Sequence, residues 1–136
     1  MISVEESVRT VSRAEDTTTY YTGDGPADGP TWVYIHGWGC RRTDFAPAAA
    51  FLPTGDRAIP VDLPGHGDST SARTDWTTAE FTQDAAAVLD AESVARCVAV
   101  GHSMGGAVAL ESGSHHFPFE KPAGTAEVLV AARRTA

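Results

Sequence analysis

The chain has 136 residues, which fits one domain spanning residues 1–136. Ten basic against eighteen acidic side chains give a formal net charge of −8, and the largest basic cluster is a pair of arginines, so we expect no nucleic-acid partner. The amino terminus lacks the basic start and apolar run of a signal peptide, and no segment is long enough to cross a membrane. We therefore expect a cytoplasmic protein without a membrane partner.

Two strand-like segments open the chain. Residues 4–11 and 17–22 have the composition of strands, and they predict an antiparallel pair near the amino terminus. Residues 23–30 are rich in glycine and proline, which is typical of a turn. Because another strand-like run follows at once, this stretch is a connector within one domain.

The next strand-like run, residues 32–35, is rich in β-branched and aromatic side chains and leads into His36, Gly37, Trp38 and Gly39. A tight loop flanked by glycines can aim a backbone N–H group at a negatively charged oxygen. Stabilising such an oxyanion takes donors from two places, and the N–H of Trp38 is one candidate. The alternative interpretation of this loop is a plain turn with an aromatic plug.

A short helix is predicted over residues 44–52, with Thr43 as its cap and Pro47 in its first turn. Residues 57–61 then form a further strand-like run. They lead into residues 62–69, Asp-Leu-Pro-Gly-His-Gly-Asp-Ser, whose glycines and proline indicate a loop.

The sequence predicts a second helix, with clearer start signals than the first, beginning after Thr77. Thr77 and Glu80 have the spacing of a capping box, and Trp76 and Phe81 have the spacing of a hydrophobic staple. Four apolar residues then share one face of the helix: Phe81, Ala85, Val88 and Leu89. We interpret this face as core and not as a binding surface.

The most informative segment follows the apolar run 97–100. Gly101, His102, Ser103, Met104 and Gly105 come next, and a helix-compatible run begins directly after them. A strand, a Gly-x-Ser-x-Gly turn and a helix form a nucleophile elbow, which exposes the serine hydroxyl. The two glycines are needed because side chains two positions before and after the serine would collide. The N–H of Met104, at the start of the helix, is the second candidate oxyanion donor.

Three motifs in this order carry a resemblance: His-Gly-Trp-Gly, Asp-Leu-Pro-Gly-His-Gly-Asp-Ser and Gly-His-Ser-Met-Gly-Gly. Over roughly residues 15–112 the chain resembles the amino-terminal half of α/β-hydrolase-fold proteins of the esterase, lipase and cofactor-free haloperoxidase type. The resemblance implies a partial α/β-hydrolase fold. That fold is a mostly parallel sheet of about six strands flanked by helices, with its carboxyl-terminal strands missing.

The resemblance also implies residue roles. Ser103 matches the family nucleophile, and the backbone amides of Met104 and Trp38 match the oxyanion hole. A serine at this position points to acyl transfer, because relatives that open epoxides or displace halide carry aspartate there. The residues expected to shape the site are His36, Gly37, His66, Gly101, His102 and Gly105. No cofactor is implied, and the spacing of Cys40 and Cys97 suggests neither a metal site nor a disulfide.

The chain departs from the family in its catalytic base. The family triad runs Ser, then Asp or Glu, then His, and the last two belong to loops after later strands. His115 and His116 are expected at the far end of the elbow helix. They would lie more than about 12 Å from the Ser103 hydroxyl, which is beyond hydrogen-bond reach. His102 is expected to point across the sheet from Ser103, because neighbouring strand residues alternate faces. His66 is then the one surrogate base available within the chain.

The last part of the sequence supports an interrupted domain. Two prolines and a glycine within residues 111–122 predict an early end to the elbow helix, and residues 126–131 read as a sixth strand. No carboxylate follows that strand, so the acid that some relatives of the family place there is also absent. An exposed last strand predicts marginal stability, dimerisation or aggregation.

Two functions follow from these patterns. The first is a serine hydrolase that acts on carboxylic esters or related small acyl compounds through Ser103. The alternative is a catalytically inactive remnant, or one half of a split hydrolase, whose role is binding or assembly. Under that alternative the partner is a second copy of the chain or a complementing carboxyl-terminal half.

Overall fold

The computed structural model describes residues 7–115 of the chain, and side chains as far as residue 111. The described residues form a five-stranded sheet with the strand order β1-β2-β4-β3-β5. Its strands are β1 (Val8–Arg13), β2 (Thr17–Thr22), β3 (Thr31–Ile35), β4 (Arg57–Val61) and β5 (Val98–Gly101).

The sheet is mixed. β1 and β2 form the predicted antiparallel hairpin, and β2 also meets β4 in antiparallel orientation. The parallel part consists of β4, β3 and β5. The sixth strand predicted over residues 126–131 lies outside the described residues, as do residues 4–6 of the first predicted strand.

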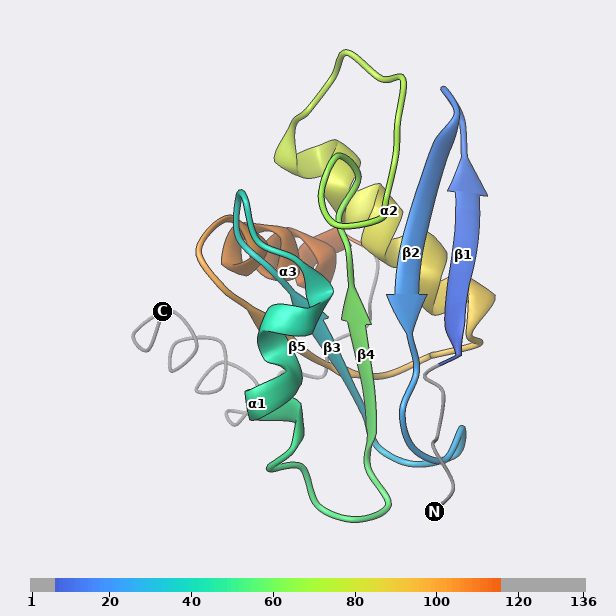
Figure 1. Ribbon diagram of the computed structural model, residues 1–136, viewed down its shortest axis with the longest axis vertical. Coiled ribbons are helices and arrows are strands. Elements are labelled where there is room, and N and C mark those ends of the chain that lie inside the picture. Colours follow the sequence, from blue (N-terminus) through green and yellow to red (C-terminus); the bar gives the residue numbers. More distant parts are fainter. Residues whose placement is uncertain (1–6, 116–136) are drawn as a thin grey trace.

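Helices cover both faces of the sheet (Figure 1). α2 (Thr78–Ala91) and α3 (Met104–His115) pack on one face. Their buried residues, including Phe81 and Val88 of the predicted apolar face, join the inward side chains of β3 and β4 in the larger core cluster. The other face carries η1 (Arg42–Phe45) and α1 (Ala46–Ala49), where Phe45 packs near Tyr34.

The helix predicted over residues 44–52 is divided in the structure. The chain forms the 3-10 turn η1 and then the single α-helical turn α1, with Arg41 and Phe45 as the N-cap residues in place of Thr43. Pro47 is the physical reason, because it has no N–H to donate to the carbonyl of Thr43 four residues earlier. That carbonyl accepts from the N–H of Ala46 instead, as in a 3-10 helix.

The start of α2 matches half of the predicted capping box. Thr77 Oγ1 accepts a hydrogen bond from the N–H of Glu80 at 3.3 Å. The reciprocal bond is replaced, since the N–H of Thr77 donates to Asp75 at 3.0 Å and the Glu80 carboxylate pairs with Arg13. The predicted staple is present, with the rings of Trp76 and Phe81 6.1 Å apart.

The amino-terminal hairpin is tied to the end of α2 by a cluster of polar side chains. Glu92 accepts from Arg9 and Arg57, and its other oxygen accepts from the hydroxyl of Tyr21 at 2.8 Å. Burial, together with the hydrogen bond to Glu92, raises the pKa of Tyr21 to about 12. The phenol therefore stays protonated and keeps donating across the neutral pH range.

Candidate active site

Ser103 lies in the turn between β5 and the first residue of α3, so the predicted order of strand, turn and helix is confirmed. Its side chain is exposed, and its φ of 56° falls in the left-handed region. A residue with a Cβ adopts this conformation at a cost of about 1–3 kcal/mol. The turn therefore holds a strained, exposed serine at the amino terminus of a helix.

The two glycines of the elbow have no room for a side chain. A Cβ built on Gly101 would lie 2.3 Å from the carbonyl oxygen of Gly105, which confirms that the two positions approach each other. A Cβ on Gly105 would lie 1.9 Å from the carbonyl oxygen of Ile35, at the end of β3. The backbone before Ser103 thus packs directly against the backbone after it, and both pack against the end of β3.

The loop of residues 36–39 borders Ser103. Because β3 and β5 are parallel with Ile35 opposite Gly101, the loops after both strands leave the same edge of the sheet (Figure 1). A Cβ on Gly37 would lie 3.1 Å from the Cβ of Ser103. The structure therefore brings the loop that carries Trp38 against the serine, while Trp38 as a residue is 69% exposed.

The start of α3 leaves a backbone donor beside the serine. The N–H groups of Gly105 and Gly106 donate to the carbonyls of His102 and Ser103, both at 2.9 Å. Met104 precedes them as the first residue of α3, and an N–H at this position has no acceptor within the helix. A negatively charged oxygen next to Ser103 would find this donor and the positive end of the helix dipole.

His36 is fully buried and joins the two loops that follow β3 and β4. Its Nε2 accepts from the N–H of Leu63 at 2.9 Å, so its Nδ1 carries the proton and donates to the carbonyl of Gly37 at 2.8 Å. Burial lowers the pKa of His36, and the nearby His66 lowers it further. The neutral ring is the form that the contact with Leu63 requires.

His66 lies on the outer side of His36. The two imidazole rings are 4.9 Å apart, and the edge of His66 meets the indole of Trp38 at 5.1 Å. Nδ1 of His66 lies 3.2 Å from the carbonyl oxygen of Pro64, in its own loop. The structure thus brings His66 next to the loop that borders Ser103.

The other histidines occupy different positions. The expectation that His102 points across the sheet from Ser103 is wrong. β5 ends at Gly101, so strand alternation does not govern these two residues, and both side chains lie next to Gly37. His115 is the last residue of α3, about 16 Å along the helix from Met104 at 1.5 Å per residue. His116 lies outside the described residues.

Arg42 and Asp62 are functional candidates that the sequence interpretation missed. Asp62 is completely buried and accepts from both the backbone N–H and the guanidinium of Arg42. The two residues are twenty positions apart, on η1 and on the loop after β4. The available signal was Asp62 itself, a carboxylate at the start of a glycine-rich motif.

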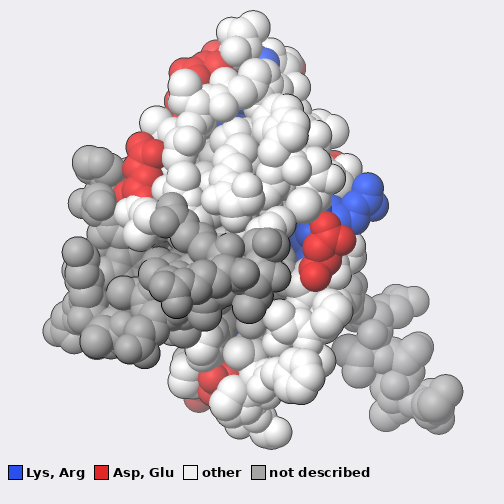
Figure 2. Space-filling view, turned by 90° about the vertical axis from the view of Figure 1, so that its left-hand side faces the viewer, with Lys and Arg blue, Asp and Glu red and all other residues white. Residues whose placement is uncertain are grey.

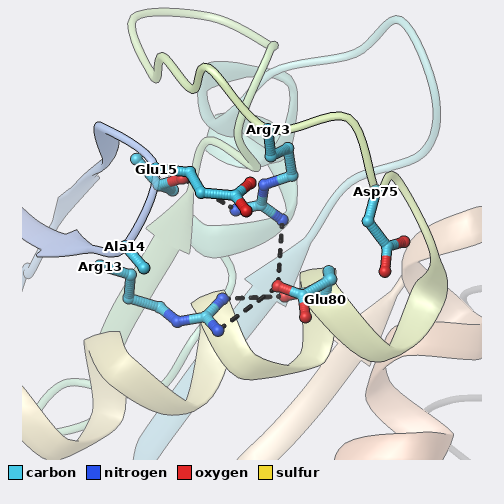
Figure 3. A pocket seen from close by; sticks show the side chains of 7 residues that line it. Arg13, Ala14, Glu15, Arg73, Asp75 and Glu80 are labelled. Atoms are coloured by element: carbon cyan, nitrogen blue, oxygen red, sulfur yellow. Dashed lines mark hydrogen bonds and ion pairs between the residues drawn. The ribbon is translucent and has the colours of Figure 1, made fainter.

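A separate cavity of about 210 Å³ lies between the β1–β2 turn, the loop before α2 and the first turn of α2. Figure 3 shows Arg13 and Arg73 converging on Glu80 from two sides. Beneath them, the buried Asp84 accepts from both guanidinium groups at 2.7 Å. Positive and negative side chains are paired here, so the cluster anchors the hairpin to α2.

Outside these sites, the described residues offer no cluster of metal-binding side chains, and no large charged patch on the face shown in Figure 2. On the face in Figure 2, the charged side chains of described residues form separate spots on a mostly uncharged surface. Between residues 7 and 115, no three His, Cys, Asp or Glu side chains are grouped to hold a metal ion, and no helix is long and apolar enough to span a membrane. Cys40 and Cys97 are both free.

Comparison with known proteins identifies the family. The model of the alpha/beta hydrolase family matches residues 32–136, which include the elbow and both preceding loops. The chain belongs to the alpha/beta hydrolase family. Its described fold is a part of that fold, a five-stranded mixed sheet with flanking helices.

Its relatives include enzymes and a subunit of an assembly. The chain is 35% identical over 98 residues to a non-heme chloroperoxidase of Streptomyces lividans, a match that covers 71% of this chain and 36% of that protein. It is 38% identical over 88 residues to the magnesium-chelatase 30 kDa subunit of Rhodobacter capsulatus, covering 64% of this chain and 31% of that protein. These matches span about a third of each relative's length.

A solved structure extends the comparison. An esterase from Rhodococcus sp. ECU1013 superimposes with a TM-score of 0.71 at 31% identity, over 81% of this chain and 41% of that one. The relatives of this chain therefore include esterases and haloperoxidases of one family, and the esterase shares its fold over 81% of this chain.

Proposed function

We propose that this chain is part of a serine hydrolase that acts on carboxylic esters or related small acyl compounds, with Ser103 as the nucleophile. The observation that supports this most is the placement of Ser103. It is exposed, has a φ of 56°, and lies 3.1 Å from where a Cβ of Gly37 would be, beside the loop of residues 36–39.

The chemistry would proceed in two acyl transfers. Ser103 Oγ attacks the carbonyl carbon of the ester, and the carbonyl oxygen becomes an oxyanion held by the N–H groups of Met104 and Trp38. The carbon–oxygen bond to the alcohol then breaks, the alcohol leaves with a proton, and an acyl-enzyme remains. Water attacks this ester in the same way and releases the acid and free Ser103.

The attack needs a base that takes the proton of Ser103. Two sources of this base remain: a histidine of a further part of the fold, which is the position that the family uses, or His66, which borders the loop of Trp38 and would act as a surrogate. His36 is unsuited to the role, because both of its ring nitrogens are engaged in buried contacts.

Hydrolysis of 4-nitrophenyl acetate tests the proposal, with release of nitrophenolate measured for the chain and for Ser103→Ala. Ser93→Ala is the matched control, because Ser93 is also exposed and has a φ of 55°, yet it lies at the end of α2. Activity that is lost in Ser103→Ala and kept in Ser93→Ala supports the proposal. Equal activity in all three proteins contradicts it.

A second candidate function is assembly without catalysis. It is favoured by the similarity to a magnesium-chelatase subunit and by two large apolar side chains at the surface, Phe51 with 89% and Leu110 with 49% exposure. The partner would be a second copy of the chain or a complementing carboxyl-terminal half. Sedimentation of the chain and of Phe51→Ser tests self-association: a dimer that Phe51→Ser dissociates supports it, and a monomer at all concentrations contradicts it.

A further inference from the structure

In the loop of residues 36–39, His36 and Gly37 are buried, whereas Trp38 and Gly39 are exposed. Gly39 has a φ of 81°, and a Cβ on it would meet nothing within 4 Å, so little packing holds the outer half of the loop. Trp38, which carries the one large side chain of this outer half, is 69% exposed. The direction of the Trp38 N–H therefore depends on how the two ends of the loop are held.

The first end is held by His36, which binds the N–H of Leu63. Within the loop, the carbonyl of Gly37 accepts from His36 Nδ1 at 2.8 Å and from the N–H of Cys40 at 3.1 Å. This closes a turn around Trp38.

On the other side of Trp38, the chain is held three residues beyond the loop by Arg42, the first residue of η1. Its backbone N–H donates to Asp62 Oδ1 at 2.7 Å, and its guanidinium donates to Asp62 Oδ2 and, at 3.1 Å, to the exposed carboxylate of Asp68. Asp62 Oδ2 also accepts from the N–H of Asp68 at 3.0 Å. A Cβ on Gly67 would lie 2.3 Å from the Asp62 carboxylate, so the loop after β4 closes tightly around it.

The chain on both sides of Trp38 is thus attached to two neighbouring residues, because His36 binds Leu63 and Arg42 binds Asp62. A carboxylate as fully buried as that of Asp62 is stable only when paired and hydrogen-bonded. Since the backbone N–H and the guanidinium of Arg42 are both bound to it, η1 cannot shift without breaking a buried ion pair.

We propose that Arg42 and Asp62 are positioning residues that fix the Trp38 N–H toward the oxyanion formed beside Ser103. Neither side chain touches the reacting atoms. They act by preventing the loop of residues 36–39 from turning its donor away. This inference rests on the proposed function of Ser103 and adds to it the residues that keep its oxyanion hole formed.

The test combines a reactivity measurement with a measurement of order. The first is the rate at which a fluorophosphonate probe modifies Ser103, followed by intact mass. The second is the NMR order parameter of the Trp38 backbone amide, which does not depend on catalysis. Arg42→Gln removes the guanidinium, and Arg42→Lys restores a positive charge. Arg41→Gln is the matched control, because Arg41 is the exposed neighbouring arginine.

We expect Arg42→Gln to slow labelling at least about tenfold, since misplacing an oxyanion donor removes much of its effect. The order parameter of the Trp38 amide should fall from about 0.85 to below about 0.6, the range of flexible backbone. Arg42→Lys should recover most of the rate, and Arg41→Gln should match the unmodified chain. If Arg42→Gln does not fold, the isosteric Asp62→Asn takes its place, with Asp90→Asn on the exposed side of α2 as its control.

Labelling at the original rate with an unchanged order parameter in folded Arg42→Gln would overturn the inference. If Ser103 of the unmodified chain does not react at all, the proposed function fails. The order parameter of the Trp38 amide alone then tests whether Arg42 and Asp62 hold the loop. A mobile Trp38 amide in Arg42→Gln would support the positioning role even in that case, and a rigid one would refute it.

Discussion

The carbonyl oxygen of Ile35 faces the α-carbon of Gly105 so closely that a Cβ there would lie 1.9 Å from it. This contact joins the end of β3 to the first turn of α3. It seats the helix that begins after Ser103 on the neighbouring strand, next to the loop that carries Trp38. The position of the serine therefore depends on the absence of a side chain at residue 105.

Gly105→Ala should destabilise the fold by about 3 kcal/mol or more, because backbone must move to admit the methyl group. Gly23→Ala is the matched control, since its Cβ would meet only the ends of flexible arginine side chains, the nearest at 3.3 Å. Urea unfolding monitored by circular dichroism measures both. Equal midpoints for the two variants would show that the elbow is not packed as described.

Replacing Ser103 by alanine and by glycine should separate chemistry from strain. Both variants remove the hydroxyl, but only Ser103→Ala keeps a Cβ at a φ of 56°. The free energy of unfolding should therefore be about 1 kcal/mol higher for Ser103→Gly than for Ser103→Ala. A lower value for the glycine variant would mean that residue 103 is not strained in the folded chain.

Asp84→Asn should cost about 3 kcal/mol in the free energy of unfolding. Asp84 is completely buried, and its loss as an anion removes the closer of the two charge partners of the buried Arg73 guanidinium and leaves only Glu80 at 4.0 Å. Asp90→Asn, on the exposed side of α2, should change stability by less than about 0.5 kcal/mol. Thermal unfolding of the two variants checks the difference, and a similar small effect for both would contradict the anchoring role of the cluster.

The folded chain should lose stability as the pH falls from 7 toward 5. Burial lowers the pKa of His36, so the unfolded chain takes up a proton below about pH 6.5 while folded His36 does not. Binding of that proton favours the unfolded state, by up to about 1.4 kcal/mol per pH unit. Urea titrations at several pH values measure the slope. The dependence of the free energy of unfolding on pH should become weaker in His36→Asn and remain in His66→Asn. An unchanged dependence in His36→Asn would show that other groups cause it.

Elements with a local signal could be predicted from the sequence. The strands β3, β4 and β5, the apolar face of α2 and the turn around Ser103 each depend on residues close together in the chain. The glycine spacing of the elbow even predicts a contact, because Gly101 and Gly105 approach each other only in that turn.

Other features depend on residues far apart and leave no local pattern. The buried pair of Arg42 and Asp62 joins two loops, and Glu92 reaches back to the amino-terminal hairpin through Arg9. Two local predictions were partly wrong because other contacts compete. Asp75 accepts from the N–H of Thr77 and Arg13 pairs with Glu80, so the second bond of the expected capping box does not form, and Pro47 divides the expected helix.

The central claim is that Ser103 is an activated nucleophile, and intact-mass analysis after treatment with a fluorophosphonate probe tests it most directly. We predict a single adduct on the folded chain that is absent in Ser103→Ala and retained in Ser93→Ala. Loss of the adduct in His66→Asn as well would identify His66 as the base. A folded chain that forms no adduct, or one that persists in Ser103→Ala, would contradict the claim.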